Sequence, residues 1–299
     1  MLGFVGLNKP SGLTSHDCIS RLRKLFKFKK IGHGGTLDPS ATGVLPIAIG
    51  KATRLIPFLP KNKAYKATII FGLKTRTDDL EGEIIRVKSG IGLTLEDVKS
   101  LLNNFIGNIE QIPPLYSAIQ KNGKRLYFSA REGEKVDIPS RTVRIDTIKI
   151  LDWHPGEFPE LTINIQCGSG TYIRSLARDL GEKLGIGGTL AKLVRTKSCG
   201  IILPDTSTLE RISKQFKYNE FTLIKPEYLL KELPSLKLSS KESMCWCQGQ
   251  KILINIPKLE LFSKFIRVKN EEEFLGIGCY VSDGKDDFLK PKVVIKEIL

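Results

Sequence analysis

The chain has 299 residues, 41% of them hydrophobic and 26% charged, which is typical of globular proteins and excludes a fibre or a disordered chain. Lysine and arginine number 47 against 32 acidic residues, so the net charge is +15, a balance that attracts polyanions. No apolar run approaches the roughly 18 residues of a membrane span, and the first residues lack the pattern of a signal peptide, so we expect a cytoplasmic protein without a membrane anchor.

The first part of the chain predicts both helices and strands. Ile19, Leu22 and Phe26 share one face of a helix, with Ser15 as its expected cap. Strict alternation of apolar and other residues over 64–72 predicts a strand. Thr94 and Asp97 form a capping-box-like pattern that predicts the start of a helix, which Gly107 is expected to end. Residues 161–167 alternate as a further strand. A helix is expected after Gly170, with Ile173, Leu176, Ala177 and Leu180 facing inward.

A domain boundary is expected near residues 230–236. The stretch 204–234 contains three prolines and only weak periodicity, and short alternating segments such as 265–268 and 292–295 follow it. We therefore predict two domains, 1–234 and 235–299, the second small and β-rich.

The positive charge is concentrated in the first three quarters of the chain. Residues 1–60 hold nine Lys or Arg and two acids, whereas residues 235–299 hold eleven and nine. Nucleic acid is the expected partner, with a generic basic surface as the alternative. The six cysteines are scattered, and the C-x-C of Cys245 and Cys247 has no second pair, so we expect free thiols and no metal site.

One segment combines tight turns with a single acid. Residues 32–50 read GHGGTLDPSATGVLPIAIG, and Asp38 is the only acid between Asp17 and Asp78. Pro39 disfavours helical geometry at Asp38. A lone carboxylate in a basic region repels phosphate, so it has either a chemical task or the ordinary role of a turn aspartate that accepts backbone N–H groups.

This segment resembles the catalytic motif of TruB-type tRNA pseudouridine synthases, which make pseudouridine-55 in the T arm. Further blocks that resemble the family follow in order over about residues 8–200: Asn8-Lys9-Pro10-Ser11-Gly12, Lys63-Ala64-Tyr65, Arg76-Thr77-Asp78, Gln111-Ile112-Pro113-Pro114, Tyr116-Ser117-Ala118, Cys167-Gly168-Ser169-Gly170-Thr171-Tyr172-Ile173-Arg174 and Leu193-Val194-Arg195. The resemblance implies an α+β fold with a mixed, largely antiparallel sheet, a catalytic domain at 1–234 with a mobile thumb at about 117–145, and a PUA-like RNA-binding domain at 235–299.

The resemblance also implies a reaction. A uridine at position 55 in the T loop of tRNA would flip out of the RNA and be isomerised without a cofactor. Asp38 would be the nucleophile, attacking either uracil C6 or ribose C1′. Arg174 would keep Asp38 ionised, or would instead contact phosphate. Tyr65 would stack on the flipped base and assist at C5, or would instead pack in the core.

The other implied site residues have supporting roles. Tyr172 and Leu193 would wall the pocket, and Lys9 and Pro10 would support the loop that bears Asp38. His33 would fill the space left by the flipped base, with a plain polar loop residue as the alternative. The family also suggests a monomer with no protein partner.

Two other functions compete with this enzyme. A non-catalytic RNA-binding or RNA-folding protein would tolerate the loss of Asp38. A methyltransferase would need a nucleotide-cofactor loop, and neither G-x-G-x-x-G after a strand nor a P-loop occurs. The glycine-rich residues 185–188 follow a helix and are expected to form its terminal turn.

Overall fold

The computed structural model describes residues 1–116, 120–121, 124–125, 138–254 and 263–296. Most of the predicted thumb, including Arg131, lies outside the described residues. The last residues of the predicted thumb, from Arg141 on, lie in a long strand of the main sheet, β10 (Arg141–His154).

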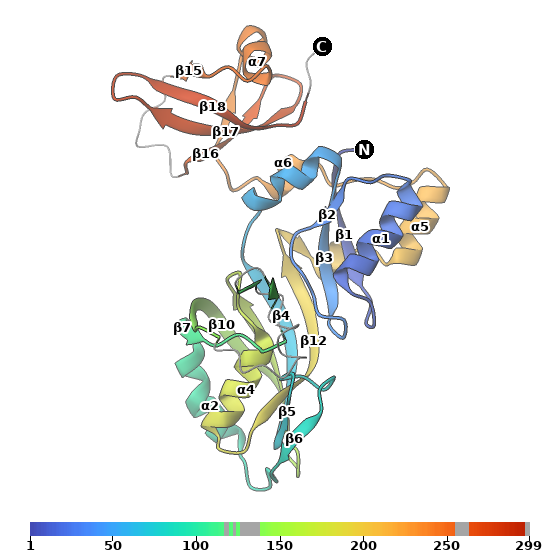
Figure 1. The fold of residues 1–299 in the computed structure, drawn as a ribbon, viewed down its shortest axis with the longest axis vertical. Helices are drawn as coiled ribbons and strands as arrows, with labels where there is room; N and C mark the ends of the chain where they lie inside the picture. The colour runs from blue at the N-terminus through green and yellow to red at the C-terminus, as the bar shows by residue number, and fades with distance from the viewer. Residues whose placement is uncertain (117–119, 122–123, 126–137, 255–262, 297–299) are drawn as a thin grey trace.

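The described residues form two large sheets and two two-stranded hairpins, and the largest sheet has nine strands (Figure 1). Seven of them follow the order β1-β3-β12-β4-β11-β10-β7, while β2 pairs with β3 and β13 with β12. Their bounds are β1 Gly3–Lys9, β2 Ile31–His33, β3 Thr42–Ile49, β4 Lys63–Phe71, β7 Gly107–Gln111, β10 Arg141–His154, β11 Glu160–Cys167, β12 Gly188–Ser198 and β13 Ile201–Ile202. Within this sheet the strands pair antiparallel except for one parallel step between β3 and β12. The expected mixed, largely antiparallel α+β fold is thus confirmed.

Helices cover the sheet in two groups. The bounds of the longer helices are α1 Ser15–Phe26, α2 Leu95–Leu102, α4 Ile173–Lys183, α5 Leu209–Lys217 and α7 Ser240–Cys247. Shorter elements are α6 Pro226–Leu229, the 3₁₀ segments η1 Gly50–Phe58, η2 Asn103–Phe105 and η3 Leu203–Asp205, and the hairpin strands β5 Leu73–Thr75, β6 Ile84–Val87, β8 Gln120–Lys121 and β9 Lys124–Arg125. Residues of α1 and α5 are buried against β1 and β3, whereas α2 and α4 pack on β4 and β11, at the opposite end in Figure 1.

Several local predictions are confirmed and others need correction. Tyr65 and the alternate residues up to Phe71 are buried on one face of β4. The cap of α1 is Thr14 rather than Ser15, because the Thr14 side chain and Asp17 form a reciprocal capping box. The helix capped by Thr94 ends at Leu102 and continues as η2, so Gly107 begins a strand instead of ending the helix.

The stretch 204–234, which has only weak periodicity in the sequence, contains a helix in its first half that was not predicted. This stretch contains α5, which Thr208 caps. Phe216 on α5 packs edge-on against Phe26 of α1, with ring centroids 5.0 Å apart. The contact joins segments far apart in sequence, so local sequence patterns do not predict it.

The second sheet begins at Ser235 and lies at one end of the molecule (Figure 1). Its strand order is β14-β16-β17-β18-β15, with bounds β14 Ser235–Lys237, β15 Ile252–Ile254, β16 Phe265–Lys269, β17 Phe274–Ser282 and β18 Asp287–Val294. Ile277 and Ile295 are buried in one cluster with Leu59 and Leu229, so apolar packing joins the second sheet to the first part of the chain.

Candidate active site

Asp38 lies in the loop between β2 and β3, and hydrogen bonds from distant elements hold that loop. Ser15 at the start of α1 exchanges hydrogen bonds with Leu37: its Oγ accepts from the Leu37 N–H at 2.9 Å and donates to the Leu37 carbonyl at 3.1 Å. The ammonium of Lys9 donates to the carbonyl of Pro39. The residues on both sides of Asp38 are therefore fixed by side chains outside the loop.

Arg195 of β12 supports the same loop from the other side. Its side chain is fully buried. It donates hydrogen bonds to the carbonyl oxygens of Gly35 at 2.9 Å, Thr36 at 3.1 Å and Val44 at 2.7 Å. A guanidinium suits this task because its planar fork offers several donors in fixed directions. Arg195 thus determines the path of the chain before and after Asp38.

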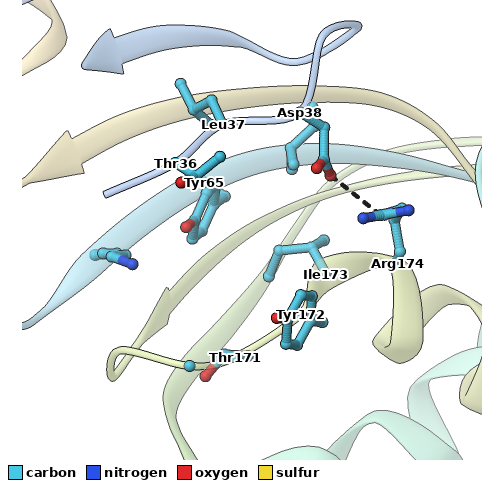
Figure 2. Close-up of a pocket in the computed structure, with 11 residues that line it drawn as sticks. Thr36, Leu37, Asp38, Tyr65, Thr171, Tyr172, Ile173 and Arg174 are labelled. Carbon is cyan, nitrogen blue, oxygen red and sulfur yellow. Dashed lines mark ion pairs between the residues drawn. The ribbon is translucent and has the colours of Figure 1, made fainter. Parts of the chain in front are cut away.

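Arg174, in the first turn of α4, lies between two carboxylates. Its Nε is 3.1 Å from Asp38 Oδ2 (Figure 2), and its Nη1 is 3.4 Å from Asp79 Oδ2. The guanidinium also donates to the carbonyls of Thr77 and Tyr116. Nε makes no aligned hydrogen bond among the described residues, so the Asp38 contact is an ion pair.

The environment of Asp38 acts on its ionisation in opposite directions. Burial raises the pKa of Asp38, and the nearby carboxylate of Asp79 adds to that rise. The charges of Arg174, Lys9 and Arg195 lower it, Arg174 most strongly. The net pKa lies above the ordinary value of 3.8. Although 39% of the Asp38 side chain is open, the open part borders a cavity, where solvation is weaker than at a convex surface.

The first cavity measures about 240 Å³ and has aromatic walls (Figure 2). Asp38, Tyr65, Tyr172, Arg174 and Leu193 all line it, so five of the predicted site residues meet in one place. They come from the β2–β3 loop, β4, the start of α4 and β12. The backbone of Tyr172 is held by Gln111, whose amide exchanges two hydrogen bonds with it.

Tyr65 is a neutral phenol in this setting. Burial is the main cause that raises its pKa to about 12, while the charge of Arg195 opposes the rise. Its ring shares the buried face of β4 with Ala67 and Ile69, yet it also borders the cavity. The packing and pocket interpretations of Tyr65 are therefore compatible.

A second cavity of about 350 Å³ adjoins the same carboxylate. Asp38, Arg174 and Leu193 line both cavities. The walls of the second cavity carry hydroxyl and charged groups, among them Ser11, Ser40, Thr42, Asp79, Glu81 and Lys192. Asp38 thus borders two adjoining cavities, of which only the first has aromatic side chains in its walls.

The remaining predicted residues lie around the Asp38 loop rather than in the first cavity. His33 is half-buried in β2, its Nδ1 accepts from the Gly35 N–H at 3.3 Å, and burial lowers its pKa. Pro10 is exposed, and its carbonyl accepts a hydrogen bond from Lys9 at 2.8 Å. Neither His33 nor Pro10 lines either cavity.

Two residues of the site were not identified from the sequence. Asp79 contacts Arg174, whereas its neighbour Asp78 pairs with Arg178 at 2.9 Å. The backbone of Asp78 has φ +62°, and this turn directs the two adjacent carboxylates to different arginines. The other residue is Lys63, which lines the first cavity; it starts the strand that carries Tyr65, and that position is the signal that could have drawn attention to it.

No group of three or more His, Cys, Asp or Glu side chains in the described part of the chain is placed to hold a metal ion. Among the helices within the described ranges, none is both long and apolar enough to cross a membrane.

Known protein families match most of the chain. Residues 23–173 match the family described as TruB family pseudouridylate synthase (N terminal domain). Residues 234–295 match the one described as Pseudouridine synthase II TruB, C-terminal.

Individual relatives agree with the family match. The chain is 55% identical to tRNA pseudouridine synthase B of Gloeothece citriformis, over 99% of this chain and 97% of the relative. It is 50% identical to the protein of the same name from Microcystis aeruginosa, over 99% and 100%. A solved Cbf5-Nop10-Gar1 complex contains a chain of similar fold, with a TM-score of 0.71, 24% identity and coverage of 98% of this chain and 84% of that one. The protein therefore belongs to the TruB family of pseudouridylate synthases.

Proposed function

We propose that this protein is a tRNA pseudouridine-55 synthase, which isomerises a uridine in the T loop of tRNA, with Asp38 as its nucleophile. The ion pair between Asp38 and Arg174, at the mouth of a cavity walled by Tyr65 and Tyr172, carries the proposal. Relatives at about half identity over nearly the full length are named tRNA pseudouridine synthase B, which supports tRNA as the substrate class.

The reaction moves a base without changing its oxidation state. The N1–C1′ bond breaks, the uracil turns, a C5–C1′ bond forms, and the hydrogen at C5 leaves as a proton while N1 gains one. The carboxylate of Asp38 attacks either uracil C6 or ribose C1′ and leaves again as the new bond is completed. Arg174 keeps Asp38 anionic although burial raises its pKa, so a nucleophile is present near neutral pH.

The two cavities suit a nucleotide turned out of its RNA. The flipped uracil stacks on Tyr65, and Tyr172 and Leu193 close the other sides. Tyr65 is neutral because its pKa is about 12, so its hydroxyl acts as a hydrogen-bonding group and a relay for the C5 proton rather than as a standing tyrosinate.

Residues outside the cavity prepare this geometry. Lys9 fixes the carbonyl of Pro39 next to Asp38, and the carbonyl of Pro10 holds the same ammonium. His33, neutral because burial lowers its pKa, enters the RNA loop and occupies the space of the flipped base. We assign His33 no proton transfer.

The proposed roles of the rest of the chain in RNA binding correspond to the two predicted domains. We propose a catalytic domain at 1–234, with a thumb-like insertion at about 117–145, and a PUA-like RNA-binding domain at 235–299. Phosphate contacts from the basic side chains position the tRNA without reading its sequence. The protein would act as a cytoplasmic monomer that needs no cofactor or protein partner.

Tritium release from a tRNA transcript with 5-tritiated uridine tests the proposal. Joining through C5 must release that hydrogen to water, so the wild-type protein should release it stoichiometrically from one uridine. Asp38→Asn should abolish release, and so should replacement of the T-loop uridine. Asp152→Asn is the matched control, because its carboxylate is more than half exposed, contacts the His154 ring and the Trp153 N–H, and lines neither cavity.

The opposite result would support the competing function. If the folded wild-type protein binds the transcript but releases no tritium, it is a non-catalytic RNA-binding protein. Asp38→Asn would then bind RNA as tightly as the wild type or more tightly, because one repulsive charge is removed.

A further inference from the structure

Lys63 is a cation of the first cavity that the proposed chemistry does not use. It begins β4 two residues before Tyr65 and lines the same cavity as Asp38. In register it faces Cys167 on β11 and Ser198 on β12. Its side chain is half-buried, and within the described ranges its Nζ has neither an ion-pair partner nor a hydrogen-bond partner. A charge removed from water in this way is unfavourable unless an anion joins it.

Among the described residues, the groups that act on the charge of Lys63 include a second cation and no carboxylate. A Cβ built on Gly35 would lie 3.6 Å from Lys63 Nζ and 3.7 Å from Arg195 Nη1, so both cations border the same part of the loop. Burial and the charge of Arg195 lower the pKa of Lys63. The other groups that act on it are the thiols of Cys167 and Cys199, whose own pKa values burial raises. Neutral thiols do not balance the ammonium.

Asp38 is not the missing partner of Lys63. The charges that act on Asp38 are those of Arg174, Asp79, Lys9 and Arg195, and Lys63 is not among them. One part of the cavity thus holds a carboxylate that is already paired, and another holds an ammonium without an anion. A nucleotide has a matching arrangement, because the rest of the ribose separates its reacting atoms, in the base and at C1′, from its charged phosphates.

We propose that Lys63 binds a phosphodiester oxygen next to the flipped uridine, so that the base and C1′ are placed at Asp38. This inference rests on the proposed function and adds a phosphate subsite to it. An ammonium is a donor-only group, so it would also accept a uracil carbonyl as partner. A carbonyl carries no net charge, however, and only an anion offsets the burial of the unpaired cation.

Synthetic T-arm hairpins with one neutral methylphosphonate link test the proposal. The link replaces the phosphate on either the 5′ or the 3′ side of the target uridine, and kcat/KM is measured by tritium release. At one of the two positions the neutral link should slow the wild-type enzyme roughly tenfold to a hundredfold, the range of a lost charge-assisted hydrogen bond. It should leave Lys63→Met almost unaffected, because that variant already lacks the contact, while Lys63→Arg should remain sensitive.

Lys66→Met is the matched control. Lys66 lies on the same strand but is exposed on the opposite face, so this variant should keep the wild-type response to the neutral link. Equal losses for wild type and Lys63→Met at both positions would overturn the phosphate subsite, as would no loss for the wild type at either. Failure of the wild type on the all-phosphate hairpin would instead contradict the proposed function, so the two failures are distinguishable.

The pH dependence provides a test that does not need the methionine variant to fold. Because the pKa of Lys63 is lowered, its charge and its share of RNA binding are lost as pH rises through that lowered value. KM of the wild type should therefore rise at alkaline pH, whereas KM of Lys63→Arg should stay level. The thiols of Cys167 and Cys199 and the phenol of Tyr65 border Lys63, and burial raises the pKa of each. Lys63→Arg keeps all three groups, so any effect of their titration is common to both proteins. A parallel rise in both proteins would contradict the proposal.

Discussion

The ammonium of Lys9 donates a hydrogen bond of 2.9 Å to the carbonyl oxygen of Pro39, the residue directly after Asp38. The same fully buried ammonium donates to the carbonyls of Pro10 at 2.8 Å and Leu13 at 2.7 Å. One side chain at the end of β1 therefore joins the start of the chain to the loop that carries the proposed nucleophile. Its charge also helps to lower the pKa of Asp38.

Lys9→Met should lower both stability and rate. The carbonyl oxygens of Pro10, Leu13 and Pro39 lose their shared donor, which should reduce the free energy of unfolding by roughly 3 kcal/mol. The rate should fall because Asp38 is held less firmly and its pKa rises further. Thermal melting and single-turnover tritium release measure the two effects. Lys24→Met, at an exposed position on α1, is the control and should have the melting temperature of the wild type. If Lys9→Met also had the wild-type melting temperature, Lys9 would not stabilise the loop that carries Asp38.

The acid limb of the pH–rate profile should report Asp38. The reaction needs its carboxylate, so the rate should rise with pH as Asp38 ionises. Because the pKa of Asp38 is raised, the midpoint should lie above the ordinary value of 3.8. Arg174→Met removes the strongest opposing charge and should move the midpoint further up. A midpoint that moves down in Arg174→Met would show that another group controls the limb.

Asp79→Asn should shift the same limb in the other direction. The Asp79 carboxylate raises the pKa of Asp38, so its neutralisation should lower the midpoint. The plateau rate should nevertheless fall by about tenfold, or roughly 1.4 kcal/mol, because Arg174 loses one of the two carboxylates that hold it. Single-turnover profiles of the two variants measure both quantities. Asp78→Asn removes a carboxylate that pairs with Arg178 instead and should leave the midpoint in place.

Gly43→Ala should unfold the junction of β3 and β12. Gly43 has φ +99°, and a Cβ there would lie 2.3 Å from the carbonyl oxygen of Arg195. Backbone strain and a clash with another backbone should together cost several kcal/mol, on the order of 3 or more. Gly92→Ala has similar strain at φ +89° but meets no atom within 4 Å, so it should cost about 1 kcal/mol. Equal melting temperatures of the two variants would contradict this difference.

Local patterns in the sequence predicted the helices and strands that bury one face along their whole length. The alternation along β4 and the inward face of α4 follow from side-chain periodicity alone. The helix α5 was missed because only Ile212 in it is fully buried, and its packing partner Phe26 is far away in sequence. The α1 cap was misplaced by one residue because Thr14 and Ser15 are both good capping residues.

The candidate site was predictable in part. Asp38 and Arg174 are 3.1 Å apart in space but distant in sequence, and only the family resemblance linked them. No periodicity distinguishes Asp79 from Asp78, because a left-handed residue in the turn decides which carboxylate faces Arg174. Lys63 stood in a recognised motif, yet its lack of an anionic partner is a property of three dimensions.

The parallel step at Gly43 and Arg195 has a consequence for the protein during its synthesis. The loop with the proposed nucleophile emerges from the ribosome early, but the strand that shapes it follows about 150 residues later. At ordinary translation speeds this delay is roughly 10 to 30 s. Throughout that interval the nascent chain already carries its most basic segment but has no finished pocket. The growing polypeptide is therefore able to attract RNA before it is able to modify it.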